Sequence, residues 1–141
     1  MASRKPENGY ISSVNRALTT AVYREKTSNP FRKGMPDMYY EGDKGSLWIE
    51  FKWRYKIIGE LCLTDRMKGG FLSHFQSEWL KRAHACGQRV GVIVGSPDGG
   101  VILPNLMFQE RWTISPATLC TPKEVAQWIQ RRTMWKTIES S

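Results

Sequence analysis

Residues 34–53, "GMPDMYYEGDKGSLWIEFKW", contain two short β-type segments joined by the turn-rich sequence "EGDKGS". We expect strands at about 37–40 and 47–53. In the second strand Glu50 and Lys52 share one face with Trp48, because successive side chains of a strand point to opposite faces. The opposite face is continuously apolar and suits the core. If the two strands pair antiparallel, Asp37 lies beside Glu50 and Lys52.

The flanking sequence predicts helices and further strands around this hairpin. Apolar residues at helical spacing indicate a first helix over about 7–23. A helix over about 73–85, a buried strand over 89–96, a second, edge strand in "VILPNL" and a last helix over about 121–137 follow. The order α-β-β-(β)-α-β-(β)-α predicts an α/β (α+β) fold with a mixed central sheet flanked by helices. At 141 residues, we expect one domain over residues 1–141.

Composition favours a polyanionic partner and argues against a membrane protein. The chain has 21 Lys and Arg against 13 Asp and Glu, which gives a net charge of +8. Such an excess is typical of nucleic-acid-binding proteins. No apolar run approaches the roughly 20 residues that span a bilayer, so we expect no membrane association. The three cysteines, Cys62, Cys86 and Cys120, lack the spacing of zinc ligands and indicate reduced thiols in a cytoplasmic protein.

The charged residues of the hairpin suit a divalent metal site. Two carboxylates that converge repel each other unless a cation lies between them. Oxygen ligands of this kind suit Mg²⁺ or Mn²⁺, which share their coordination with a substrate phosphate. A neighbouring lysine can orient the attacking water and stabilise charge on the phosphorus. The alternative is a hairpin whose charged face is only solvated, and that alternative stays open on these residues alone.

"GMPD" followed by "IEFK" resembles the GxPD…(E)xK motif of the PD-(D/E)XK nuclease superfamily. The order of segments is most similar to the VRR-NUC branch, small virus-type replication-repair nucleases related to Holliday junction resolvases. In that branch a helix with an acidic residue precedes GxPD, and a helix with a Q-x-x-W/L pattern and a buried strand follow ExK. Here "FQSEWL" and "RVGVIVGS" match those two segments, so the resemblance covers about residues 7–96 and implies a restriction-endonuclease-like fold.

The resemblance implies a set of site residues. Asp37 and Glu50 would bind the metal with the backbone carbonyl of Phe51, and Lys52 would be the catalytic lysine. Glu7 would be the acid from the first helix. Gln76 would complete the catalytic group, although "SHFQ" also reads as a capping box in which Gln76 has only a structural role. A carboxylate at position 7 likewise suits a helix N-terminus without any metal.

The chain departs from the family in the connection between ExK and the glutamine helix, which is usually short. Here a basic insertion at about 54–72 separates the two motifs. It is expected to add a hairpin and loop that contact DNA, or to be a surface embellishment or a dimer contact. Candidate DNA contacts are the basic residues before the motif and in the insertion: Arg32, Lys33, Arg54, Lys56, Arg66 and Lys68.

Together these residues predict an endonuclease that uses Mg²⁺ or Mn²⁺ to hydrolyse DNA, with branched DNA such as a Holliday junction as substrate. Two symmetric cuts in a four-way junction would require a homodimer. A restriction-like or nicking nuclease on duplex DNA and a non-catalytic basic DNA-binding module are the alternatives. The expected location is the cytoplasm of a bacterial cell or of a phage-infected host.

Overall fold

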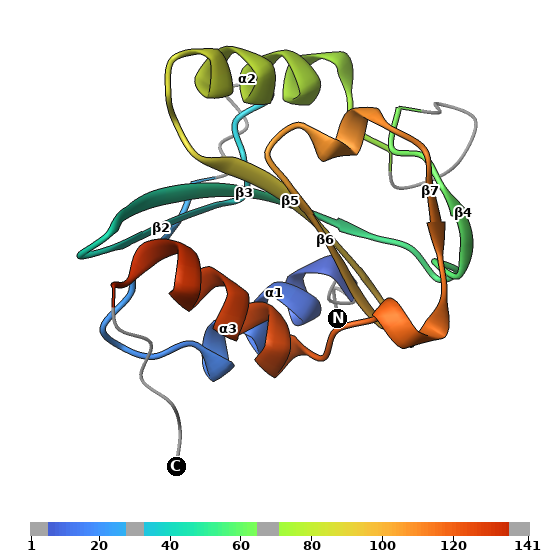
Figure 1. Cartoon of the computed structure of the whole chain (residues 1–141), viewed down its shortest axis with the longest axis horizontal. Coiled ribbons are helices and arrows are strands. Elements are labelled where there is room, and N and C mark those ends of the chain that lie inside the picture. Colours follow the sequence, from blue (N-terminus) through green and yellow to red (C-terminus); the bar gives the residue numbers. More distant parts are fainter. Residues whose placement is uncertain (1–5, 28–32, 65–70, 136–141) are drawn as a thin grey trace, which may run out of the picture.

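The computed structural model describes residues 6–27, 33–64 and 71–135. Its centre is a five-stranded sheet with strand order β1-β2-β3-β5-β6 (Figure 1). Strands β3 and β5 are parallel, and the other neighbouring pairs are antiparallel. The strands are β1 (Tyr23–Lys26), β2 (Met38–Gly42), β3 (Gly45–Trp53), β5 (Val90–Ser96) and β6 (Gly99–Pro104).

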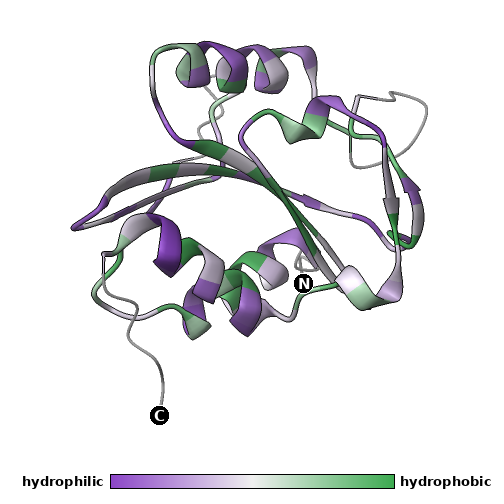
Figure 2. Cartoon of the chain, in the orientation of Figure 1, coloured by the Kyte–Doolittle hydropathy of each residue, from purple (hydrophilic) through white to green (hydrophobic). Residues whose placement is uncertain are grey.

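Helices cover both faces of this sheet. Helix α1 (Pro6–Ala17) and helix α3 (Pro122–Thr133) pack together on one face, and α2 (His74–Ala85) lies on the other (Figure 1). Hydrophobic residues run along β5 and β6 between these layers, whereas the helices carry hydrophobic and hydrophilic stripes (Figure 2). The mixed sheet flanked by helices agrees with the sequence-based prediction.

Local sequence explains where α2 and α3 begin. Ser73 and Thr121 are N-caps, and each forms a reciprocal capping box with the residue three positions later, Gln76 and Glu124. Such a box satisfies two backbone N–H groups that have no partner inside the helix. Helix α3 ends at Thr133, four residues before the expected end.

The first helix is shorter than predicted. Apolar spacing suggested a helix to about residue 23, but α1 ends at Ala17 and the chain enters β1 at Tyr23. The apolar residues Leu18 and Val22 are buried after the helix has ended, so they satisfied a helical period without belonging to a helix. The short strand β1 was therefore missed.

Strand β3 is buried on both faces. Leu47, Ile49 and Phe51 join the core against α1 and α3, as the alternation predicts. On the other face Trp48 packs against the second core, which lies under α2 and contains Val92 of the adjacent strand. Glu50 therefore projects into a largely apolar environment.

The described parts of the insertion, residues 54–64 and 71–72, are anchored in the protein. Strand β4 (Gly59–Leu61) pairs antiparallel with β7 (Trp112–Ile114), beyond the end of the main sheet. Ile57 and Leu63 are buried in the core under α2. Short 3₁₀ turns lie before and after β7, namely η1 (Met107–Gln109) and η2 (Pro116–Thr118). Within the described ranges no helix is long and apolar enough to cross a membrane.

Candidate metal and active site

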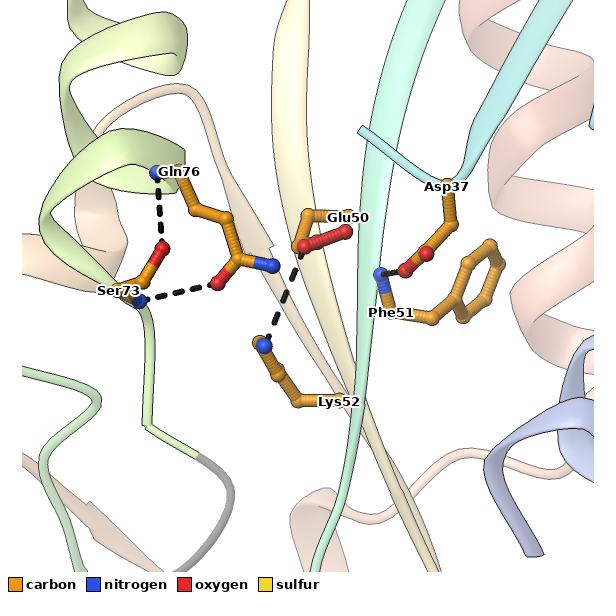
Figure 3. A network of polar contacts seen from close by, with 6 residues as sticks. All are labelled: Asp37, Glu50, Phe51, Lys52, Ser73 and Gln76. Atoms are coloured by element: carbon orange, nitrogen blue, oxygen red, sulfur yellow. Dashed lines mark hydrogen bonds and ion pairs between the residues drawn. The ribbon is translucent and has the colours of Figure 1, made fainter. Parts of the chain in front are cut away.

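The antiparallel hairpin places Asp37 opposite the second half of β3. The β2–β3 register ends at the pair Met38–Ile49, so Asp37 lies where the two strands diverge. The side chain of Asp37 takes the place of the missing strand partner, because its Oδ2 accepts a hydrogen bond of 2.8 Å from the Phe51 N–H (Figure 3). A second tether comes from the residue after β1, because the Thr27 N–H donates to the Asp37 carbonyl at 2.9 Å.

The same divergence exposes the Phe51 carbonyl to the site. The N–H and C=O of one strand residue point to the same edge, and those of the next residue point to the other. Arg54 donates its N–H to the Gly95 carbonyl on the β5 side. Phe51, three residues earlier, therefore directs its carbonyl toward Asp37, beyond the last β2–β3 pair.

Glu50 is a buried acid. Its residue is 1% exposed, and within the described part of the chain neither carboxylate oxygen has a hydrogen-bond donor. Burial raises the pKa of Glu50 well above its ordinary value, and the adjacent Asp37 carboxyl raises it further. Lys52 opposes these effects, with its Nζ 4.0 Å from Glu50 Oε2. The raised pKa means that this environment favours the protonated, neutral form of Glu50.

Glu7 lies within electrostatic range of this pair. It is half-buried in the first turn of α1, and its charge is the weakest of those that raise the pKa of Glu50. Within residues 6–27, 33–64 and 71–135, no three Asp, Glu, His or Cys side chains converge in a metal-binding cluster. Asp37 thus acts on Glu50 more strongly than Glu7 does.

Gln76 approaches from α2 and makes both contacts of the capping box. Its side-chain oxygen accepts a 2.9 Å hydrogen bond from the Ser73 N–H, and its own N–H donates to Ser73 Oγ at 3.1 Å. Its amide nitrogen is turned toward Glu50 and Lys52 (Figure 3). The capping role uses only the side-chain oxygen, so the side-chain NH₂ group remains directed at the site.

The glycine of "GMPD" makes a contact that the sequence did not reveal. Gly34 has φ +83°, and a Cβ there would lie 2.3 Å from the carbonyl oxygen of Phe75. The loop before Asp37 therefore packs directly against the first turn of α2. Sequence indicated the unusual backbone of a Gly-x-Pro loop, but the contact joins segments about 40 positions apart, which spacing along the chain cannot show.

The predicted DNA contacts divide into three groups. Lys33 and Lys56 are exposed. Arg54 is 8% exposed and donates to the Cys62 carbonyl at 3.1 Å, so it holds the insertion in place, contrary to the expectation of a surface phosphate contact. Arg32, Arg66 and Lys68 lie outside the described residues.

The donor set fits a divalent metal ion. Mg²⁺ is usually bound by one or two carboxylates, waters and substrate phosphate rather than by a complete protein cage. Asp37 and Glu50, together with the Phe51 carbonyl, are the hard oxygen groups here that could hold such an ion. The observation that favours a cation there is that the two buried carboxylate oxygens of Glu50 receive no hydrogen bond from the described residues.

Comparison with solved structures identifies the fold. The chain is similar to Hjc of Archaeoglobus fulgidus, a Holliday junction resolvase from an archaeal hyperthermophile, with a TM-score of 0.53. The identity is 20%, over 85% of this chain and 96% of that protein. This chain has a restriction-endonuclease-like fold. That part of the sequence-based expectation is confirmed. No protein-family model and no curated protein matches the sequence.

Proposed function

We propose that this protein is an endonuclease that requires a divalent metal ion and hydrolyses phosphodiester bonds in DNA. The observation that carries the proposal is the buried Glu50 carboxyl, which lies beside Asp37 and Lys52 and has no donor for its oxygens among the described residues. A buried acid in this environment lowers the stability of the folded protein. Acids with perturbed pKa values cluster at functional sites. The net charge of +8 suits a DNA substrate.

Asp37, Glu50 and the Phe51 carbonyl would hold the metal. Glu7 would attract the metal by its charge or bind it through a water molecule. Bound Mg²⁺ or Mn²⁺ supplies Lewis acidity and lowers the pKa of a coordinated water. The Phe51 N–H fixes one oxygen of Asp37, which leaves the other free to act as a ligand. Lys52 orients the attacking water and stabilises negative charge that develops on the phosphate. Gln76 offers its side-chain NH₂ group to the same space.

For the substrate we propose branched DNA, such as a Holliday junction, because the similar protein Hjc is a Holliday junction resolvase. Cleavage of two symmetric strands requires two such sites, so we propose that the chain acts as a homodimer, with one nuclease domain over residues 1–141. The VRR-NUC resemblance of the sequence motifs supports the same proposal. With DNA as the substrate, the protein acts inside a bacterial cell or a phage-infected host.

A cleavage assay tests this function. Purified protein incubated with a four-way junction and Mg²⁺ or Mn²⁺ is expected to cut it, and EDTA is expected to stop the reaction. Asp37→Asn and Lys52→Ala should each lower the rate by about 10²- to 10³-fold, because each removes charge that acts in the transition state. Lys52→Ala should still bind the junction in a gel-shift measurement.

Three outcomes distinguish the alternatives. Equal cutting of linear duplex and junction would favour the restriction-like or nicking nuclease. Binding with no cutting under any metal would favour the DNA-binding module. Cutting that Asp37→Asn leaves unchanged would place the activity outside this site.

A further inference from the structure

An exposed aromatic ring lies at the rim of the candidate site. Phe75, in the first turn of α2, is 52% exposed and directly precedes Gln76. A single exposed apolar residue is common on protein surfaces and needs no explanation. Phe75 differs because two independent contacts fix its position and its surroundings.

Both contacts come from the loop that carries Asp37. The Nζ of Lys33 lies 5.0 Å from the centre of the Phe75 ring, which is cation–π distance. The next residue, Gly34, packs its α-carbon against the Phe75 carbonyl. The ring, its cation and the acid loop therefore form one unit. The side-chain nitrogen of Gln76, the next residue after Phe75, is turned toward Glu50 and Lys52 (Figure 3).

We propose that Phe75 and Lys33 form a platform for a DNA base that has left the base stack at a branch point, next to the phosphate that is cut. An aromatic ring can stack on any base, and stacking is therefore tolerant of sequence. Lys33 adds a positive charge for the adjoining phosphate. The proposal rests on the proposed nuclease function and defines how the site would select branched DNA.

The charge around the ring supports a nucleic acid as the occupant. Tyr23 on β1 is as exposed as Phe75, at 54%, but its hydroxyl donates to the carboxylate of Glu25 at 3.1 Å. That surface would repel phosphate. Both surfaces present an aromatic ring. Stacking of a nucleic-acid base therefore suits the Phe75 surface, which carries a positive charge, and not the Tyr23 surface, which carries a negative one.

Selection of branched DNA follows from the cost of unstacking. A base inside a continuous duplex must break its pair and its stack before it can reach the platform, whereas an unpaired base at a fork pays much less. Phe75 is thus expected to strengthen binding to branched DNA specifically. Lys33 is expected to strengthen binding to any DNA, because it contacts the backbone.

The test compares binding to a splayed fork and to a linear duplex of the same length, in EDTA so that no strand is cut. We expect Phe75→Ala to weaken fork binding by about tenfold and duplex binding by less than about twofold. Phe75→Trp should retain fork binding. A 2-aminopurine at the branch should become more fluorescent on binding wild type, and Phe75→Ala should reduce this rise. Tyr23→Ala is the matched control and should change neither affinity.

Equal loss of fork and duplex affinity in Phe75→Ala, or no loss of either, would overturn the platform. The same holds if wild type binds fork and duplex equally. These measurements are independent of cleavage. Selective fork binding through Phe75 without cleavage would retain the platform and refute the nuclease. Cleavage by a protein whose fork binding does not depend on Phe75 would retain the nuclease and refute the platform.

Discussion

Glu50→Gln is expected to eliminate metal-dependent cleavage and, in metal-free buffer near neutral pH, to make the protein more stable. Loss of activity on the order of 10³-fold is expected because the substitution removes a charged metal ligand at the reacting centre. The gain in stability has a separate cause. The glutamine amide is neutral, donates to Asp37 and accepts from Lys52, whereas the acid is buried without a donor among the described residues.

The pH dependence gives this prediction its sign. The pKa of Glu50 is raised in the folded protein above the ordinary value of 4.5, so the folded state binds a proton that the unfolded state has lost. This contribution to wild-type stability is fully present below about 4.5 and is lost as the pH rises through the folded pKa. Glu50→Gln has no such loss. Denaturant unfolding in EDTA should therefore show little difference near pH 5 and a larger one, about 1–3 kcal/mol, near pH 8.

Divalent metal should reverse the order of stability. A ligand that binds the folded state alone stabilises it in proportion to the logarithm of its concentration. Mn²⁺ at saturating concentration should raise the midpoint of wild-type unfolding and raise that of Glu50→Gln much less.

Glu78→Gln is a suitable control, because Glu78 is exposed and pairs with Lys81. Its pKa is lowered by that pair, so its contribution to stability changes only below the ordinary value of 4.5; the control should show no pH trend between pH 5 and pH 8 and should retain cleavage. If Mn²⁺ does not change the unfolding midpoint of the wild type, the proposed metal site is wrong.

The sequence was sufficient for the hairpin and for the charged side of β3, because strand alternation is a local property. It also located the capping box at Ser73, which depends on residues three positions apart. It failed where tertiary structure overrides a local pattern. Val22 continued a helical period, yet it is buried beyond the end of α1. Arg54 had the charge of a DNA contact, but it is buried and donates to the Cys62 carbonyl, just after β4; β4 itself pairs with β7, about 50 residues later in the chain.

The role of Asp37 shows the same limit within the site. Its proximity to Glu50 followed from antiparallel pairing and was predictable. The hydrogen bond from the Phe51 N–H was not, because it depends on the residue at which β2 and β3 diverge. The difference matters for function, since that bond orients one carboxylate oxygen and leaves the other available.

Gly34→Ala is expected to reduce both stability and cleavage strongly, and Gly87→Ala to reduce stability slightly. The two glycines have nearly the same backbone conformation, φ +83° and φ +85°. A side chain in this region costs about 1–2 kcal/mol at either position. At Gly34 the new methyl group would also meet the Phe75 carbonyl oxygen at 2.3 Å and its carbon at 2.5 Å. These are backbone atoms, so the loop and α2 must separate, which adds about 1–3 kcal/mol.

The difference between the two variants measures how far the acid loop depends on α2. At Gly87 a Cβ would have no neighbour within 4 Å, so Gly87→Ala reports the backbone cost alone and should cut DNA at the wild-type rate. Separation of the loop from α2 moves Asp37 relative to Gln76 and disturbs the carboxylate pair. Gly34→Ala should therefore lose cleavage even at a temperature where circular dichroism and denaturant unfolding show it fully folded. Equal losses of stability in the two variants would mean that the loop adjusts freely, and that the close packing of Gly34 on α2 does not hold Asp37 in the site.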